Sequence, residues 1–532
     1  MRLRPFASSL IALLLAAGCE DRPPPPLPLD AGTVEPGEVA WGSCSGTRST
    51  TCAEVELPLD WDALDGPTYP VVVRRIPGAT PSRHLWILVG GPGGDADSWE
   101  PFAQRMVQAD PRLTVYLFHQ RGTGRSGRLA CPMQESARSP GGVNVVEEEH
   151  AACIAALTLR WGDALPHISA TASARDLAFL VEQVREPGED VIVLGSSYGT
   201  YLANRYLQVA ETPPTAVVMS AIVTPDVAYP DTPATFEAAS REVFAACGED
   251  AYCSARLGSD PAATFEALLT RLDEGHCSAG DGIWSRQLVQ QVVSRLFYDW
   301  SARAVALALV HRLDRCSDDD RAALSRFRGL GGSSAGGPFS WVLFAHITLS
   351  EMWRDGGPTL EQAQALEANG LLGDGGLANF IQMRESWPRY DLDRHDNGFA
   401  ETRVPMLMIN GSLDPATPLL SAERVGAHFD APGQTFVTIE GGAHGFGAPL
   451  EDGQSCAQAM IEAFVSDPAA PVDDCGARVV PPDFRGTPEL ANAAFGTADL
   501  WDEPDPGALV ALPPVDVALT RHLSALLDGR LR

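Results

Sequence analysis

The first half of the chain alternates short apolar runs with segments whose apolar residues recur at helical spacing. Short runs rich in β-branched and aromatic residues are typical of buried strands. Such runs lie at residues 69–76, 85–89, 114–118, 191–194 and 215–219, and two more follow at 405–409 and 435–439. The helical patterns between them include residues 174–184 and 201–209. Strands that alternate with helices predict an α/β fold, with a mostly parallel sheet covered by helices.

A long segment with a different pattern separates the two groups of strands. Residues 225–398 are almost wholly helical in pattern, with glycine-rich breaks at 329–337 and 370–376. A helical insertion between two strands of one sheet is typical of a capped α/β fold. We therefore expect a core made of residues 39–224 and 399–500, a large helical cap at 225–398, and a C-terminal tail at 501–532.

The N-terminus has the pattern of an export signal. Arg2 and Arg4 precede an apolar stretch at 8–17, which is too short to span a bilayer but suits a signal peptide. The stretch ends in Leu15-Ala-Ala-Gly-Cys19, which resembles a bacterial lipobox, although cleavage without lipidation is the alternative. We expect a signal peptide at 1–18, a lipid on Cys19 and a proline-rich spacer at 19–38. This predicts a bacterial lipoprotein of the cell envelope, periplasmic or on the outer surface, that contacts the membrane only through its lipid.

The cysteine content agrees with export. Of the eleven cysteines, ten remain after Cys19 is set aside, an even number for an oxidising compartment. The sequence alone cannot fix their connectivity. The simplest arrangement joins neighbours: Cys44–Cys52, Cys131–Cys153, Cys247–Cys253, Cys277–Cys316 and Cys456–Cys475. No Cys-x-x-Cys pair occurs, so we expect no structural zinc and no other metal.

Charge and composition exclude several functions. The net charge of −30 makes nucleic acid an unfavourable partner. All 39 basic residues are Arg, because the chain contains no Lys. That excludes a Walker-type phosphate loop, a Schiff-base or PLP lysine, and a Ser-Lys dyad. We therefore expect an activity that needs no cofactor, and the oligomeric state stays open.

The strongest local motif surrounds Ser197. Gly195-Ser-Ser197-Tyr-Gly199 has the form G-x-S-x-G, between a predicted buried strand and a predicted helix. The turn leaves no room for β-carbons two residues either side of the serine, and its strain lifts the hydroxyl above the sheet. We expect Ser197 to be a catalytic nucleophile. The neighbouring Ser196 lacks the symmetric glycines.

A serine nucleophile needs a base and an acid that orients the base. His444 follows the predicted strand at 435–439, and Asp414 follows the strand at 405–409. Catalytic groups gather at such carboxyl ends of strands, and the order Ser, Asp, His suits this class of active site. We expect Asp414 and His444 to complete a triad. The alternatives that remain open are His428 and His346 for the base, and Asp430 and Asp391 for the acid.

An acyl-transfer site also needs donors for the oxyanion. The backbone N–H of Tyr198, directly after the nucleophile, is one candidate. The second comes from the glycine-rich loop 89–94, where Pro92 has no N–H and Gly91 is the best donor.

Several motifs occur together in order along the chain. They are the loop 90–94, Gln120-Arg-Gly-Thr-Gly-Arg-Ser126, the elbow with Tyr198-Gly-Thr-Tyr-Leu202, and Gly411-Ser-Leu-Asp-Pro-Ala-Thr-Pro418, with Trp41-Gly-Ser-Cys44, Cys52-Ala53 and Leu57-Pro-Leu-Asp60 near the start. This set resembles the prolyl aminopeptidase and tripeptidyl aminopeptidase group of α/β-hydrolases, and within it the secreted tripeptidyl branch. The resemblance covers residues 40–476. It implies a peptide substrate cleaved near its N-terminus, with the cap limiting substrate length.

The sequence departs from this family at three positions. His119 stands where Asp usually precedes Gln-Arg-Gly, and Val89 replaces a histidine common in prolyl aminopeptidases. Leu349 replaces a cysteine of the segment that contains Glu351. The resemblance suggests Glu351 as the residue that binds the substrate ammonium, with Asp97 and Glu100 as alternatives.

Two classes of function follow. The first is an exported serine hydrolase, expected to be an aminopeptidase that releases N-terminal residues or short peptides, with an esterase on the same triad as the alternative. The second is a non-catalytic binding lipoprotein, which would require none of Ser197, Asp414 and His444.

Overall fold

The computed structural model describes residues 39–44, 50–136, 138–142, 144–277, 284–331, 339–372, 376–501 and 515–527. The expected signal peptide, Cys19 and the proline-rich spacer lie outside these residues. Within the described ranges, no helix is long and apolar enough to cross a membrane.

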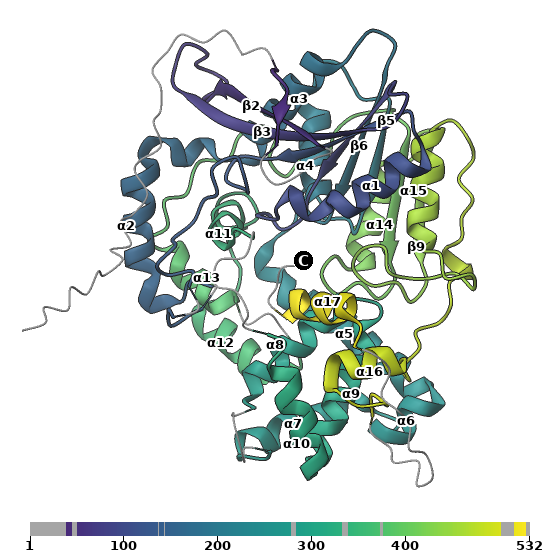
Figure 1. The fold of residues 1–532 in the computed structure, drawn as a ribbon. Coiled ribbons are helices and arrows are strands. Elements are labelled where there is room, and N and C mark those ends of the chain that lie inside the picture. The colour runs from purple at the N-terminus through teal and green to yellow at the C-terminus, as the bar shows by residue number, and fades with distance from the viewer. Residues whose placement is uncertain are drawn as a thin grey trace, which may run out of the picture.

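One sheet organises the fold (Figure 1). In the described residues it has nine strands, in the spatial order β1-β2-β3-β5-β4-β6-β7-β8-β9. The strands β4 to β9 run parallel, whereas β1, β2 and β3 form an antiparallel extension that joins β5. Their bounds are β1 Gly42–Ser43, β2 Thr51–Pro58, β3 Thr68–Pro77, β4 Arg83–Leu88, β5 Leu113–His119, β6 Asp190–Ser196, β7 Ala216–Ser220, β8 Met406–Gly411 and β9 Gln434–Ile439.

Helices cover both faces of this sheet. Strand side chains alternate between faces, and β6 illustrates this: Ile192 and Leu194 join the apolar cluster with α1 and α15, while Val191 and Val193 join the cluster with α3, α4 and α14. A strand buried on both faces is apolar throughout, which is why β6 was recognisable in the sequence. These helices are α1 Glu100–Ala109, α3 Ala170–Val184, α4 Tyr198–Val209, α14 Leu419–His428 and α15 Cys456–Ser466. A further helix, α2 His150–Trp161, lies to the side of the sheet (Figure 1).

The predicted insertion between β7 and β8 is helical. It contains α5 Thr232–Glu249, α6 Ala251–Leu257, α7 Pro261–Asp273, α8 Arg286–Phe297, α9 Ala302–Arg315, α10 Asp318–Arg328, α11 Trp341–Ser350, α12 Leu360–Asn369 and α13 Leu377–Arg384. Short 3₁₀ segments are η1 Ala96–Trp99, η2 Glu147–Glu149, η3 Gly162–His167, η4 Tyr229–Asp231 and η5 Gly476–Arg478. The expected fold class, an α/β-hydrolase sheet with a helical cap before the acid-bearing strand, is therefore observed.

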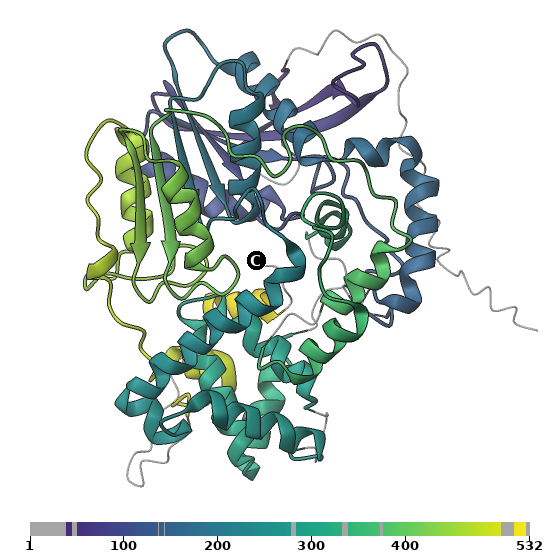
Figure 2. The ribbon, with the colours of Figure 1, turned by 180° about the vertical axis from the view of Figure 1, so that it is seen from behind.

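The cap has two parts, and one of them includes the C-terminus. Helices α5 to α10 share a separate apolar core, and α11 and α13 pack instead on the core of the sheet. Two C-terminal helices, α16 Pro488–Phe495 and α17 Val517–Leu527, bury Phe495 and Leu523 in the core of α5 to α10 (Figures 1 and 2). The predicted boundary at residue 500 is therefore misplaced, because the chain returns to the cap after η5.

Candidate active site

The turn that contains Ser197, the predicted nucleophile, lies between β6 and α4. Ser197 has φ 56° and ψ −126°, in the left-handed region that costs a β-carbon-bearing residue free energy. The flanking glycines are sterically required. A Cβ on Gly195 would lie 2.3 Å from the carbonyl oxygen of Gly199, and a Cβ on Gly199 would lie 2.0 Å from that of Leu88. The packing of β6, α4 and β4 therefore holds Ser197 in a strained conformation.

The glycine-rich loop after β4 approaches this serine closely. A Cβ on Gly90 would lie 2.8 Å from Cβ and 3.3 Å from Oγ of Ser197. Gly91, at φ 123°, lines the same cavity as Ser197 and Tyr198. Within the described part of the chain, the amides of Gly91 and Tyr198 have no hydrogen-bond partner. Both predicted oxyanion donors therefore lie beside Ser197, the predicted nucleophile.

The predicted acid and base lie side by side. Nδ1 of His444 is 2.9 Å from Oδ2 and 3.1 Å from Oδ1 of Asp414, whose side chain is fully buried. Oδ1 also accepts the N–H groups of Ala416 and Thr417, each at 2.9 Å, and Oδ2 accepts the Thr417 hydroxyl at 2.7 Å. The carboxylate is thus fixed on one side by its own turn and presents the other side to His444.

The alternative residues lie elsewhere. His346 is buried between the carbonyl of Leu165 and the indole N–H of Trp387, and burial lowers its pKa to about 4. His428 contacts the carbonyl of Ala400. Asp391 and Asp430 are exposed. Only His444 among these histidines shares a cavity with Ser197 in the described residues.

A cavity of about 120 Å³ connects the site to the cap. Ser197 and His444 line it from the core, and the cap contributes mostly apolar side chains, among them Tyr229, Phe344 and Met352. None of the described residues that line this cavity carries a carboxylate or a guanidinium. The described wall therefore suits an uncharged group next to Ser197.

Glu351 does not lie on this wall. Its Oε1 accepts from the backbone N–H of Ala170 at 2.8 Å and the hydroxyl of Tyr390 at 2.6 Å, and its Oε2 accepts from the hydroxyl of Tyr201 at 2.9 Å. Burial raises its pKa above the ordinary value, an effect that Arg205 opposes. The expected contact between Glu351 and a substrate ammonium does not fit this geometry, since both oxygens are already bonded inside the core.

The alternatives Asp97 and Glu100 are also engaged. Arg74 contacts both carboxylates, and Asp97 further binds Nε2 of His119 at 3.1 Å and Nε of Arg125 at 2.9 Å. Although burial by itself raises the pKa of Asp97, the bonds from His119 and Arg74 hold it well below the ordinary value. His119, which stands where the family usually has Asp, therefore lies between Asp97 and Asp95, whose Oδ1 is 3.4 Å from its Nδ1. Asp95, Asp97 and His119 lie close enough together to bind one metal ion. Arg74 and Arg125, however, already form ion pairs with Asp97.

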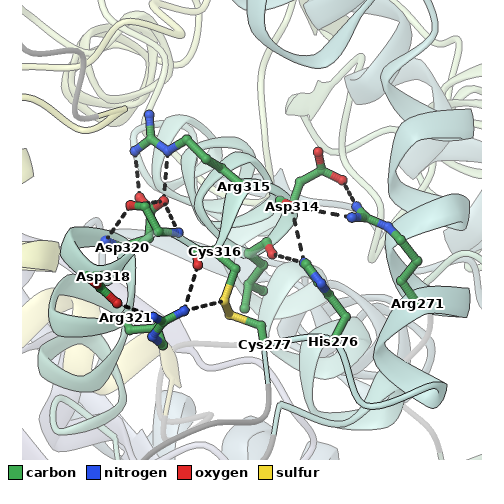
Figure 3. The surroundings of a disulfide bond; sticks show 11 residues. Arg271, His276, Cys277, Asp314, Arg315, Cys316, Asp318, Asp320 and Arg321 are labelled. Carbon is green, nitrogen blue, oxygen red and sulfur yellow. Dashed lines mark hydrogen bonds and ion pairs between the residues drawn. A yellow bond between two sulfur atoms is a disulfide. The ribbon is translucent and has the colours of Figure 1, made fainter.

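The ten cysteines form five disulfides. The pairs are Cys44–Cys52, Cys131–Cys153, Cys247–Cys253, Cys277–Cys316 and Cys456–Cys475. They are the pairs expected if each cysteine bonds to its neighbour in the sequence. Figure 3 presents Cys277–Cys316 in the cap, where Arg321 donates to the carbonyl of Cys316 at 2.8 Å. The two cysteines of a pair lie between 6 and 39 residues apart in the sequence, so each bridge closes a local loop.

Sequence reasoning missed two side chains of this site. Thr417 lies in the motif at residues 411–418, and its hydroxyl donates to Asp414 at 2.7 Å. The motif by itself assigns no role to that hydroxyl. Tyr298, between α8 and α9, lines the cavity, and its ring packs edge-on against His444 with centroids 5.4 Å apart. Nothing in the local sequence distinguishes Tyr298 from an ordinary cap residue.

Comparisons with known proteins agree with this geometry. A model of the α/β hydrolase fold matches residues 84–254, and a model described as TAP-like protein matches residues 378–476. The first range includes the glycine-rich loop 89–94 and Ser197, and the second includes Asp414 and His444. The chain is an α/β-hydrolase. Within that class it belongs to the tripeptidyl aminopeptidase-like group.

Individual relatives are more distant. Carboxylesterase B of Mycobacterium tuberculosis is 30% identical over 214 residues, which cover 33% of this chain and 40% of that protein. The chain thus spans less than half the length of this curated relative. A thermostable carboxyl esterase from Bacillus coagulans is 12% identical, covering 80% of this chain and 100% of its own, with a TM-score of 0.33. An epoxide hydrolase from an endophytic Streptomyces is 16% identical, covering 75% and 90%, with a TM-score of 0.32.

Proposed function

We propose that the protein is a serine hydrolase that acts through an acyl-enzyme on Ser197. The observation that carries this proposal is the buried Asp414 carboxylate, 2.9 Å from Nδ1 of His444, whose ring lines the same cavity as the strained Ser197. His444 takes the Ser197 proton as Oγ bonds to the acyl carbon, and the amides of Gly91 and Tyr198 bind the oxyanion. His444 then protonates the leaving group, and water, activated in the same way, releases the acid.

The substrate we place first is a carboxylic ester with a small, uncharged acyl group. The described wall supports this choice, because a buried ammonium without an opposing carboxylate is costly. The relative named carboxylesterase B is consistent with it. An aminopeptidase is the second candidate, and the match to the TAP-like model favours it.

A matched substrate panel separates these candidates. We expect p-nitrophenyl butyrate to be cleaved, and N-acetyl-alanyl p-nitroanilide to have a kcat/KM at least about tenfold above that of free alanyl p-nitroanilide, because a buried, unpaired ammonium is unfavourable. A fluorophosphonate should label Ser197 first. If free-amine peptides are cleaved faster than their acetylated counterparts, the aminopeptidase assignment replaces the ester assignment. If neither esters nor anilides are cleaved and no label attaches, the hydrolase proposal fails.

We further propose that the protein is exported and anchored by a lipid on Cys19. The pairing of all ten other cysteines supports an oxidising compartment.

This proposal has a direct test by mass. Reduction of five disulfides adds about ten hydrogens, so intact-mass spectrometry should record a gain of about 10 Da and no reactive thiol before reduction. The N-terminal peptide should begin at Cys19 and carry acyl chains. Thiols that react without reductant would contradict the bridges, and an unmodified N-terminus beyond residue 19 would contradict lipidation.

A further inference from the structure

A buried arginine of the cap contacts both catalytic loops. Arg303 is the second residue of α9, and it is only 1% exposed. Its Nη1 donates to the carbonyl of Gly441 at 2.7 Å, and its Nη2 donates to the carbonyls of Leu413 and, at 3.5 Å, Gly442. Leu413 directly precedes the acid, and Gly442 lies two residues before the base. One guanidinium therefore spans the loops that carry Asp414 and His444.

The loops and the cap are connected at further points. The N–H of Leu413 donates to the carbonyl of Gly442 at 3.0 Å, which joins the two loops directly. The N–H of His444 donates to the carbonyl of Tyr298 at 3.1 Å. The base is thus held by its own main chain and its ring against the segment just before α9, and Arg303 fixes the residues that precede it.

Among the residues that the structure describes, the positive charge of Arg303 is buried without a carboxylate partner, which costs free energy. Within the described residues its hydrogen-bond acceptors are main-chain carbonyls, so no carboxylate contacts it. Burial lowers its pKa to about 10, although the charges of Asp414 and Asp299 oppose this. Asp299 itself pairs with His522 of α17 at 2.9 Å. Burying a cation without an ion pair destabilises a fold, so the position calls for an explanation other than stability.

We propose that Arg303 is a positioning residue, through which the cap sets the orientation of Asp414 and His444. This inference rests on the proposed serine hydrolase function. A planar guanidinium presents its donors in a rigid fork and can hold two or three carbonyls at fixed spacing, whereas an ammonium donates from one nitrogen on a flexible chain. Fixed spacing matters because an error of about 1 Å in a catalytic group can lower the rate by about 10²-fold. The cap therefore contributes to catalysis besides covering the cavity.

The test compares Arg303→Gln with Arg312→Gln. Arg312 is on the same helix, is equally buried, and donates to the carbonyls of Leu500 and Asp499 at 2.7 and 2.9 Å, within the cap. Arg303→Gln should lower kcat for p-nitrophenyl butyrate by about 10–100-fold and change KM by less than about threefold, since orientation and not binding is lost. Arg312→Gln should keep its kcat per active site titrated with fluorophosphonate. It should unfold at a lower temperature, because the hydrogen bonds of Arg312 and its ion pair with Asp320 are lost.

Arg303→Lys adds a readout that loss of the charge alone would not move. It keeps a cation near Asp414 and Asp299 but not the planar fork, so it should still have a lowered kcat with a nearly unchanged KM. It also serves as the test if Arg303→Gln does not fold.

The outcomes distinguish the positioning role of Arg303 from the proposed serine hydrolase function. If Arg303→Gln and Arg303→Lys have normal kcat per titrated site, or lose no more than Arg312→Gln, the positioning role is wrong and the triad stands. If replacing Ser197 leaves the esterase activity intact, the proposed function itself is wrong.

Discussion

Replacing Ser197 with Ala is expected to lower turnover by about 10⁴–10⁶-fold, because no other group can form the acyl-enzyme. Residual rate should remain, since the amides of Gly91 and Tyr198 still bind an oxyanion while water attacks. The measurement is kcat on an activated ester at saturating substrate, with circular dichroism to verify the fold. Alanine removes one oxygen at a surface of the cavity, so the thermal midpoint should change little.

A neighbouring serine supplies the control. Ser196 is the last residue of β6 and does not line the cavity, so Ser196→Ala should keep activity within about tenfold of the native protein. Adding His444→Ala to Ser197→Ala should cost little further, because the members of a triad act as a unit. Equal activity of Ser197→Ala and the native protein would reject Ser197 as nucleophile.

The parts of the fold that the sequence predicted have local signals. β6 and β8 are apolar on both faces, and the turn after β6 requires two glycines, so both strands and the elbow were recognisable without tertiary information. The bounds differ by one or two residues, as expected where strands fray into loops. β2 was missed as a strand, although exposed Glu54 and Glu56 alternate with buried neighbours along it. Alternation of this kind marks a strand with one face in solvent.

Contacts between distant segments were not predictable. The C-terminal helices α16 and α17 pack into the cap because their apolar faces find partners on α8, α9 and α10, more than 150 residues earlier. An amphipathic pattern specifies that a helix will bury one face, but it does not specify the partner. The same holds for Arg303 and Tyr298, whose roles depend on loops more than 100 residues away.

Glu351 illustrates how a family resemblance can mislead about one side chain. Its position at the end of an apolar helix was consistent with a carboxylate that faces the cavity. In the structure, Tyr201 lies 150 residues before it and Tyr390 lies 39 residues after it, and both hydroxyls donate to its carboxylate. A buried carboxylate with three donors is stabilised where it is, so reaching the cavity would leave those donors unpaired.

Replacing Asp414 with Asn is expected to lower kcat by about 10⁴-fold with little change in KM. Oδ1 of Asp414 accepts two backbone N–H groups, so the amide oxygen of Asn would take that side. Its NH₂ group would then face Nδ1 of His444, which must become an acceptor and carry its proton on Nε2. A histidine protonated on Nε2 cannot take the Ser197 proton, and no carboxylate is left to stabilise the imidazolium that forms.

The fold should tolerate this change, because the turn keeps its two backbone hydrogen bonds and the Thr417 hydroxyl keeps a neighbour. Asp430→Asn is the matched control, since Asp430 is, with Asp391, one of the two alternative acids and is exposed. Steady-state kinetics and thermal unfolding of both variants give the answer. Asp414→Asn should unfold within a few degrees of the native protein and lose turnover, whereas Asp430→Asn should retain both. If Asp430→Asn lost turnover while Asp414→Asn stayed active, Asp430 and not Asp414 would be the catalytic acid. His444 would then have to bind Asp430 during the reaction.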